Sequence, residues 1–351
     1  MQKPMTTAVL ALALALTLTL TGCAGPNDRQ SAVTASSGFE ISSVNLPGEG
    51  RGDYIGVDAD ARRLYVTHTG SVHVLDLDTL TPLAQIDGFS KAHGVAIAPM
   101  AGVGFISDGG GNSISVFDLR TNRVSKIIRG GENPDSVIYD PASKMVFVFN
   151  GLSKDISVID PASKTIVRTI ALGDKPESAR TDGRGKIFVN LEERAAIAVI
   201  DTSTLRIAAE YKLRGCEGPA AIALDSAHRR LFTSCGNNRM LAVDADNGKI
   251  LASIPVGDDP DGIIYDPEVQ RVFVAARNGM MTVIKQDDAD HYSVEQNLNV
   301  EEYAKTLAFD PATHRIFSST AQLVWPQEVH GQKHLPDAKP GTFHLVVYTP
   351  K

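Results

Sequence analysis

The stretch "NPDSVIYDPASKMVFVFN", residues 133–150, decides the fold. Its two apolar runs, "SVIYD" and "KMVFVF", are rich in the β-branched and aromatic residues that favour strands. Between them stands "DPAS", whose Asp, Pro and Ser favour a tight reversal of the chain. The stretch therefore predicts a β-hairpin. Its first strand begins with a charged residue, Asp135, and the role of this carboxylate is the functional question that the sequence raises.

The same hairpin recurs along the chain. An aromatic residue of its second strand returns every 40 to 44 residues, at Tyr65, Phe105, Phe147, Phe188, Phe232, Phe273 and Phe317. A hydrophobic-Asp pair that ends a third strand has the same period, at Asp76, Asp118, Asp160, Asp201 and Asp244. A period near 42 residues with four short strands per repeat is typical of β-propeller blades. We therefore expect an all-β, seven-bladed β-propeller with four-stranded antiparallel blades; an open solenoid is the alternative.

The start of the repeat region predicts how the ring closes. The segment "FEISSVNLP", residues 39–47, has no hairpin of its own. If it adds the fourth strand to the last blade, the ring has no open edge. The predicted propeller then spans residues 39–351, with a long loop at about 321–341 in blade seven. This Pro-rich loop holds Trp325 and the pair His330 and His334, and we do not expect it to bind metal. We expect Trp325 to pack against the blade edge; a cover over the channel mouth or a partner contact is the alternative.

The repeat also carries a family resemblance. "DPASKMVFVFNG" and "ISVIDPASKTIVRTIALGDKPES" resemble the YVTN-repeat, YncE-like family of exported seven-bladed propellers. "GCEGPAAIALDSAHRRLFTSCGNN" and the ending "PGTFHLVVYTPK" are similar to one bacterial branch of that family. The resemblance covers nearly all of the chain after residue 38 and implies the fold. Relatives on this scaffold include lactonases, redox subunits and one branch reported to bind DNA, so function depends on the site each carries.

The first residues indicate export. "MQKP" is a short basic region, and "TTAVLALALALTLTL" is an apolar run typical of a signal peptide and too short for a membrane anchor. "LTGC", residues 20–23, resembles a bacterial lipobox, which implies a signal peptide at 1–22 and lipidation of Cys23; an ordinary secretory signal is the alternative. We expect residues 23–38 to form a flexible tether. Ala24 after the cysteine favours the periplasmic face of the outer membrane or the cell surface.

The charge of the chain indicates which classes of partner to expect. The chain carries a formal net charge of −7, which disfavours nucleic-acid binding because that binding depends on neutralising phosphates. We expect a monomer that meets the membrane only through its lipid anchor. A small-molecule or protein ligand at the channel mouth is the remaining partner class.

Equivalent positions at the start of each innermost strand predict a ring of charge around the central channel. These ring positions are Asp53, His93, Asp135, Glu177, Ala220, Asp261 and Lys305. The ends of the second strands return to the same rim, because neighbouring strands are antiparallel, and they add His68, Asp108, Asn150 and Asn190. The predicted ligand-binding rim therefore comprises Asp53, His68, His93, Asp108, Asp135, Glu177, Asp261 and Lys305.

Three interpretations of this rim stay open. The charges could simply pair at a solvated surface, where each pair contributes about 0–1 kcal/mol. They could form a binding mouth for a cationic or hydroxyl-rich ligand, or for a peptide, since crowded carboxylates attract cations. They could also hold Ca²⁺ or another divalent cation through Asp135, Asn150, Glu177 and Asn190, as in a lactonase-like hydrolase with His93 and Glu177 as catalytic candidates.

We expect a binding or scaffolding module first, and a divalent-metal-dependent lactone or ester hydrolase second. A periplasmic redox-associated subunit is third, since it would need a haem or quinone partner and the chain has no CxxCH motif. No cofactor is certain.

The two cysteines after Cys23 predict a disulfide. Cys216 precedes the first strand of blade five, and Cys235 ends the second strand, so both lie at one end of an antiparallel pair. An exported protein meets an oxidising compartment. A redox-active or metal-binding pair is the alternative, although the close CxxC spacing is missing.

Overall fold

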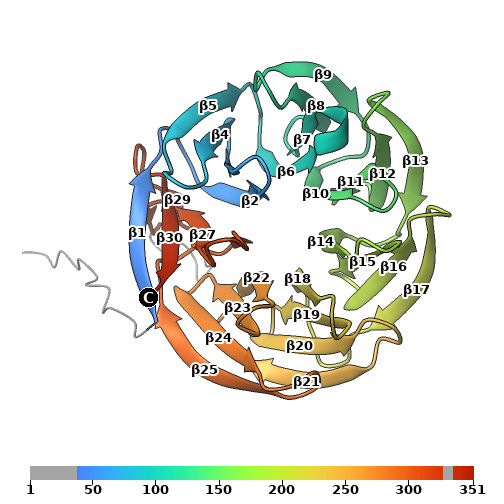
Figure 1. The fold of residues 1–351 in the computed structure, drawn as a ribbon, viewed down its shortest axis with the longest axis vertical. Coiled ribbons are helices and arrows are strands. Elements are labelled where there is room, and N and C mark those ends of the chain that lie inside the picture. The colour runs from blue at the N-terminus through green and yellow to red at the C-terminus, as the bar shows by residue number, and fades with distance from the viewer. Residues whose placement is uncertain (1–37, 327–334) are drawn as a thin grey trace, which may run out of the picture. The chain divides into compact units, whose positions relative to one another are not determined.

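The computed structural model describes residues 38–326 and 335–351. In these ranges the chain forms seven four-stranded antiparallel sheets arranged as blades around a common centre (Figure 1). The prediction of an all-β, seven-bladed propeller is confirmed. Helix is limited, within these ranges, to one 3-10 turn, η1 (Pro99–Ala101). No helix of the described part is long and apolar enough to cross a membrane. The predicted signal peptide, Cys23 and the tether up to residue 37 lie outside the described residues.

Blades one to six each consist of four consecutive strands, and these follow one another from the centre to the outer edge of the propeller (Figure 1). Blades one and two are β2 (Gly52–Asp58), β3 (Arg63–His68), β4 (Ser71–Asp76), β5 (Pro82–Asp87), and β6 (Ala92–Ala98), β7 (Val103–Asp108), β8 (Ser113–Asp118), β9 (Val124–Arg129). Blades three and four are β10 (Pro134–Asp140), β11 (Met145–Asn150), β12 (Asp155–Asp160), β13 (Thr165–Ala171), and β14 (Pro176–Thr181), β15 (Lys186–Leu191), β16 (Ala196–Asp201), β17 (Arg206–Lys212). Blades five and six are β18 (Pro219–Asp225), β19 (Arg230–Cys235), β20 (Arg239–Asp244), β21 (Ile250–Pro255), and β22 (Pro260–Asp266), β23 (Arg271–Ala276), β24 (Met280–Gln286), β25 (Tyr292–Asn299).

Blade seven joins the two ends of the described chain. Its strands, from the centre outward, are β26 (Ala308–Phe309), β27 (Ile316–Thr320), β30 (His344–Pro350) and β1 (Phe39–Asn45). β1 pairs antiparallel with β30 along its whole length, with Phe39 opposite Pro350 and Asn45 opposite His344. The predicted closure by the N-terminal strand is therefore confirmed. The segment between β27 and β30 adds a small hairpin of β28 (Leu323–Val324) and β29 (Asp337–Ala338).

The repeated aromatic residues form the contacts between blades. All seven are at most 2% exposed. Phe147 of β11, for example, belongs to one apolar cluster with Ile187 and Val189 of β15 in the next blade. The period of the sequence is thus the period of an inter-blade core, because each blade buries one face against the next.

Carboxylates at the ends of the innermost strands stabilise the face opposite the predicted rim. Asp140 accepts hydrogen bonds from the backbone N–H and hydroxyl of Ser143, which fixes the turn that follows β10. The same carboxylate accepts a 2.5 Å hydrogen bond from Thr181 of blade four. Asp266 likewise lies 2.8 Å from Nδ1 of His314 in blade seven. These aspartates therefore serve the joints between blades.

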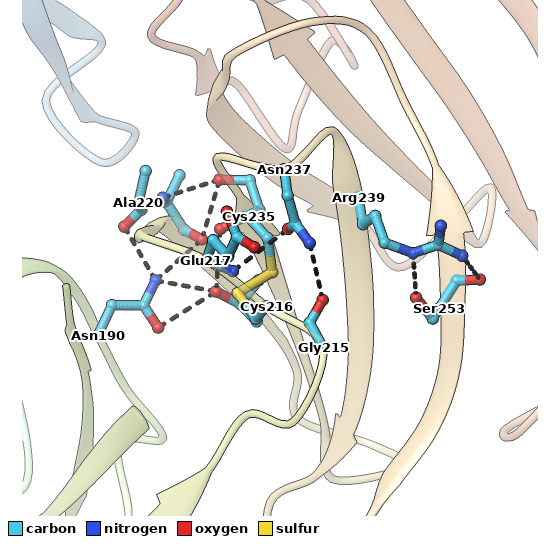
Figure 2. Close-up of a disulfide and its surroundings, with 12 residues drawn as sticks. Asn190, Gly215, Cys216, Glu217, Ala220, Cys235, Asn237, Arg239 and Ser253 are labelled. Atoms are coloured by element: carbon cyan, nitrogen blue, oxygen red, sulfur yellow. Dashed lines mark hydrogen bonds between the residues drawn. A yellow bond between two sulfur atoms is a disulfide. The ribbon is translucent and has the colours of Figure 1, made fainter. Parts of the chain in front are cut away.

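Cys216 and Cys235 form the predicted disulfide, which ties the segment before β18 to the end of β19 (Figure 2). Their Cα atoms are 5.2 Å apart. In the same region Asn190 of β15 donates a 2.9 Å hydrogen bond to the carbonyl of Ala220, a ring position (Figure 2). The bridge and this amide both hold the start of blade five at the rim.

Candidate functional site at the channel mouth

A β-bulge at the start of the innermost strands sets the direction of the ring side chains. In blades one to six the pairing register shifts between Gly52 and Ile55, Ala92 and Val95, Pro134 and Val137, Pro176 and Ala179, Pro219 and Ile222, and Pro260 and Gly262. Each shift encloses one ring position, so the ring residue lies in the bulge. A bulge re-aims a side chain, and a first-position Pro avoids losing a ladder hydrogen bond. The charged side chains can therefore leave the sheets and meet one another.

Hydrogen bonds between blades hold the backbone of the ring. Side chains of neighbouring strands donate to the carbonyl groups of the ring residues themselves. These bonds run from Thr67 to His93 (2.9 Å), Ser107 to Asp135, Asn190 to Ala220 (2.9 Å) and Thr306 to Asp53 (2.6 Å). These hydrogen bonds hold the backbone of the ring residues in place, as a preorganised binding site requires.

His93 lies between two carboxylates. Its Nδ1 is 2.5 Å from Oδ2 of Asp53 and 3.4 Å from Oδ1 of Asp135. Three possible ligand atoms, one from each residue, lie within 4.8 Å of one another. His93 is only 4% exposed, so the arrangement is fixed by its surroundings. An imidazole with two carboxylates at this spacing can share a proton or hold a divalent cation.

Burial and neighbouring charges shift the pKa values of this cluster in different directions. Burial acts to raise the pKa of Asp53, but Lys305 and His93 outweigh it, so the net shift is downward. Burial raises the pKa of Asp135 to about 6 against the opposing effect of His93. Burial lowers the pKa of His93, but the hydrogen bond to Asp53 and the Asp135 charge outweigh it, so the net shift is upward. Asp135 is therefore the carboxylate whose negative charge the protein compensates least.

Glu177 extends the acidic side of the mouth. Burial and repulsion from Asp135 raise the pKa of Glu177 to about 7, although Lys175 lies 3.0 Å away. Lys175 divides its charge, because it also forms an ion pair with Glu192. Asp135 and Glu177 together form an acidic arc over blades three and four.

The opposite side of the mouth is neutralised. Lys305 lies 2.6 Å from Asp261 and 3.7 Å from Asp53. Arg277 donates a 2.8 Å hydrogen bond to Asp261. Burial opposes ionisation of Asp261, but the two cations outweigh it and lower its pKa to about 2. Charge at the mouth is thus polarised, with paired cations over blades six and seven.

Four residues predicted for the rim or its metal site have other contacts. His68 is 3% exposed, and its ring lies 4.5 Å from the ring of Phe343 in the joint between blades one and seven. Asp108 accepts backbone hydrogen bonds from Ser90, Lys91 and Gly111 and so fixes a turn.

The amide of Asn150 donates to Asp155 and Ser157 within its own blade. Asn190 holds the backbone of blade five, as described above. The metal set predicted from Asp135, Asn150, Glu177 and Asn190 is therefore replaced, as a geometric candidate, by Asp53, His93 and Asp135.

A cavity of about 370 Å³ opens at the mouth beside this cluster. Asp53 and Lys305 line it together with Lys91, Arg277 and Tyr303. Residues 335–338 of the blade-seven insertion line its outer side, and Trp325 of that insertion lies edge-to-face with Tyr303 at 6.2 Å. The volume falls within the range of small-molecule sites.

Three residues of the mouth and channel were missing from the sequence-based set. Lys175 stands two residues before Glu177, and Arg277 stands one residue after the second-strand position of blade six. Both positions can be located by their spacing, but nothing in the sequence indicates that these long side chains contact the carboxylates of the mouth. Arg180, three residues after Glu177, lies deeper in the channel.

The comparisons with known proteins support the fold. No protein-family model matches the chain, and no curated protein matches it. Among solved structures, hydrazine synthase of Kuenenia stuttgartiensis is similar with a TM-score of 0.67 and 16% sequence identity, over 84% of this chain and 96% of that chain. At this identity the likeness shows a shared propeller architecture alone.

Proposed function

We propose that this protein is an exported, lipid-anchored binding module of the YVTN-repeat, YncE-like kind, whose channel mouth binds a cationic ligand. The observation that carries the proposal is the contact of buried His93 with the partly exposed carboxylates of Asp53 and Asp135. Such a cluster at the open end of a propeller suits binding better than stability, because its charges are only partly compensated. The simplest ligand of this class is a divalent metal ion.

The donor set indicates which ion. An imidazole nitrogen with two carboxylates suits first-row transition metals such as Mn²⁺ or Zn²⁺, whereas Ca²⁺ prefers six to eight oxygen ligands. Binding would replace the proton on Nδ1 of His93 and would compensate the charge of Asp135. Glu177 would supply further negative charge nearby.

The proposed location rests on the N-terminal sequence. "LTGC", residues 20–23, would direct cleavage before Cys23 and attach the acyl chains there. The residues after it would hold the propeller at a membrane surface, on the periplasmic face of the outer membrane or outside the cell. Labelling with a radioactive fatty acid, lost in Cys23→Ser, tests this step independently of the channel mouth.

Calorimetric titration of the metal-free protein with Mn²⁺, Zn²⁺, Ca²⁺ and Mg²⁺ tests the binding proposal. We expect one transition-metal ion per chain and weaker Ca²⁺ and Mg²⁺ binding. Asp135→Asn should weaken transition-metal binding by more than the roughly 10- to 100-fold that loss of a supporting residue causes. Glu132→Gln removes an exposed carboxylate three residues away and should change nothing. Equal binding in Asp135→Asn and the unmodified protein would remove the cluster from the site.

A metal-dependent hydrolase is the second candidate, because the cavity of about 370 Å³ adjoins Asp53. A bound metal ion can polarise the carbonyl of a lactone or ester. Glu177 is then the candidate proton carrier. A screen of lactones and esters with metal-loaded protein decides between the candidates: Glu177→Gln should abolish turnover and keep the metal, and a screen without turnover leaves the binding module.

A further inference from the structure

Below the ring, one arginine divides the channel. Arg180 lies on β14 and lines two cavities, one of about 220 Å³ towards the mouth and one of about 330 Å³ beyond it. Ile55 and Leu307 also line both cavities. The guanidinium therefore stands where the two spaces adjoin, beside the aliphatic side chains of Ile55 and Leu307, whereas other parts of the two linings are polar.

The position of Arg180 is otherwise small or apolar in every blade. Three residues after each ring position the chain has Gly56, Ala96, Ile138, Arg180, Ala223, Ile264 and Ala308. Six of these residues carry no charge. The small side chains in four blades leave room in which a long side chain can extend. This is an asymmetric feature in a repeated architecture, and the packing of the blades does not require it.

The charge of Arg180 has no protein partner in the described part of the chain. Its one hydrogen bond there runs from Nη1 to the carbonyl of Ala179, at 3.1 Å. No carboxylate of these residues forms an ion pair with it, whereas Arg62 and Arg277 each pair with two. Burial lowers the pKa of Arg180, with Tyr54 acting in the opposite direction. A guanidinium cannot lose its proton to relieve this, so its charge in the channel is left to water or to an anion that enters, and an anion compensates it more fully.

We propose that Arg180 anchors a second binding site, inside the channel, for a small organic carboxylate with a hydrocarbon body. A guanidinium presents parallel N–H groups that match a carboxylate. Ile55, Val57 and Leu307 would contact the hydrocarbon part. These aliphatic side chains favour a ligand with a hydrocarbon part over inorganic phosphate, which has no apolar part to place against them. This site is independent of the metal proposal.

Hexanoate, acetate and inorganic phosphate are the probes, each titrated at constant ionic strength into the full protein treated with chelator. We expect hexanoate to bind with a Kd near or below about 1 mM, acetate more weakly and phosphate not measurably. Arg180→Met should weaken hexanoate binding by about 10- to 100-fold, and Arg180→Lys by less, because a lysine keeps the charge and loses the paired donors. Arg168→Met, at an exposed position of β13, is the matched control.

Loss of folding should not account for weaker binding by the variants. Arg180→Met removes an uncompensated charge and should raise the melting temperature of the ligand-free protein; Arg180→Gln serves as a second variant. Asp135→Asn should leave hexanoate binding intact, which separates this site from the mouth. No hexanoate binding by the unmodified protein, or equal binding by Arg180→Met, would overturn the proposal. Phosphate binding as tightly as hexanoate would overturn the assignment to carboxylates.

Discussion

Arg62 of blade one donates two hydrogen bonds of 2.8 Å each to the carboxylate of Asp310 in blade seven, across 248 residues of sequence. The Asp310 side chain is fully buried, and the Arg62 side chain is 27% exposed. This pair joins blade one to blade seven, whereas β1 and β30 join the two ends of the described chain within blade seven. Two long-range contacts thus hold the ring closed: the strand pairing of β1 with β30 and the ion pair of Arg62 with Asp310.

Arg62→Met should therefore destabilise the propeller, because it leaves the buried carboxylate of Asp310 without its cation. We expect a loss of about 3 kcal/mol in the free energy of unfolding, measured by urea denaturation. Arg62 also pairs with exposed Asp78, so Asp78→Asn is the control and should cost less than about 1 kcal/mol. Equal effects of the two variants would show that the buried pair does not hold the ring.

His68 should make stability depend on pH. Burial, with a smaller effect from His73, lowers the pKa of His68 to about 4 from an ordinary 6.5. Below pH 6.5 the unfolded chain therefore takes up a proton that the folded protein refuses. The stabilisation is complete above pH 6.5 and is lost as pH falls towards 4, by an amount on the order of 3 kcal/mol.

Denaturation curves between pH 7 and pH 4 measure this effect. His68→Phe keeps an aromatic ring against Phe343 and should flatten the pH dependence. A slope that survives in His68→Phe would assign the acid sensitivity to other groups.

The disulfide should stabilise the rim of blade five. Cys216 and Cys235 are 19 residues apart, and a loop of this length implies about 3 kcal/mol of stabilisation. Cys216→Ser with Cys235→Ser should lower the urea midpoint accordingly. A reducing agent should have the same effect on the unmodified protein and none on the double variant; an unchanged midpoint in both would contradict the prediction.

Thr67 should tune the metal site without touching it. Its hydroxyl lies 2.9 Å from the carbonyl oxygen of His93 and 2.7 Å from that of Tyr54, so Thr67→Val removes a polar contact with the His93 backbone at nearly constant volume. We expect about 10-fold weaker Mn²⁺ or Zn²⁺ binding and a loss of about 1 kcal/mol in stability. Thr282→Val removes a buried hydroxyl that makes no hydrogen bond in the structure, and it should affect neither. Unchanged metal affinity in Thr67→Val would limit Thr67 to a structural role.

The fold could be predicted because its signal is repeated. The aromatic residue of each second strand packs against the next blade, so inter-blade packing repeats with the sequence, and spacing alone counts the blades. The contact of His93 with Asp53 and Asp135 also followed from equivalent positions, since neighbouring blades bring equivalent residues together. The charge pattern around them, in which Asp261 pairs with two cations and Asp135, among the described residues, pairs only with His93, depends on the reach of Lys305 and Arg277 and could not be predicted from the sequence.

The residues predicted at the channel mouth that have other contacts lie where local interactions differ from one blade to the next. His68 packs against Phe343, which directly precedes β30 and follows the long insertion of blade seven. Asp108 and Asn150 were expected to face the mouth because strands return to it, but nearby backbone and side-chain donors occupy them. Spacing gives the end of a strand at which a residue lies; it does not give the neighbours that compete for its polar atoms.

The pairing of β1 with β30 sets the order of assembly. β1 is made first among the strands of the propeller and its partner is made last, so this contact cannot form until synthesis has reached Pro350. Such long-range pairing is slow to form, and until then the edges of β1 and β27 stay open to other chains and to proteases. A chain that ends before β30 keeps these strand edges unpaired. Closure of the ring therefore distinguishes a complete chain from a truncated one.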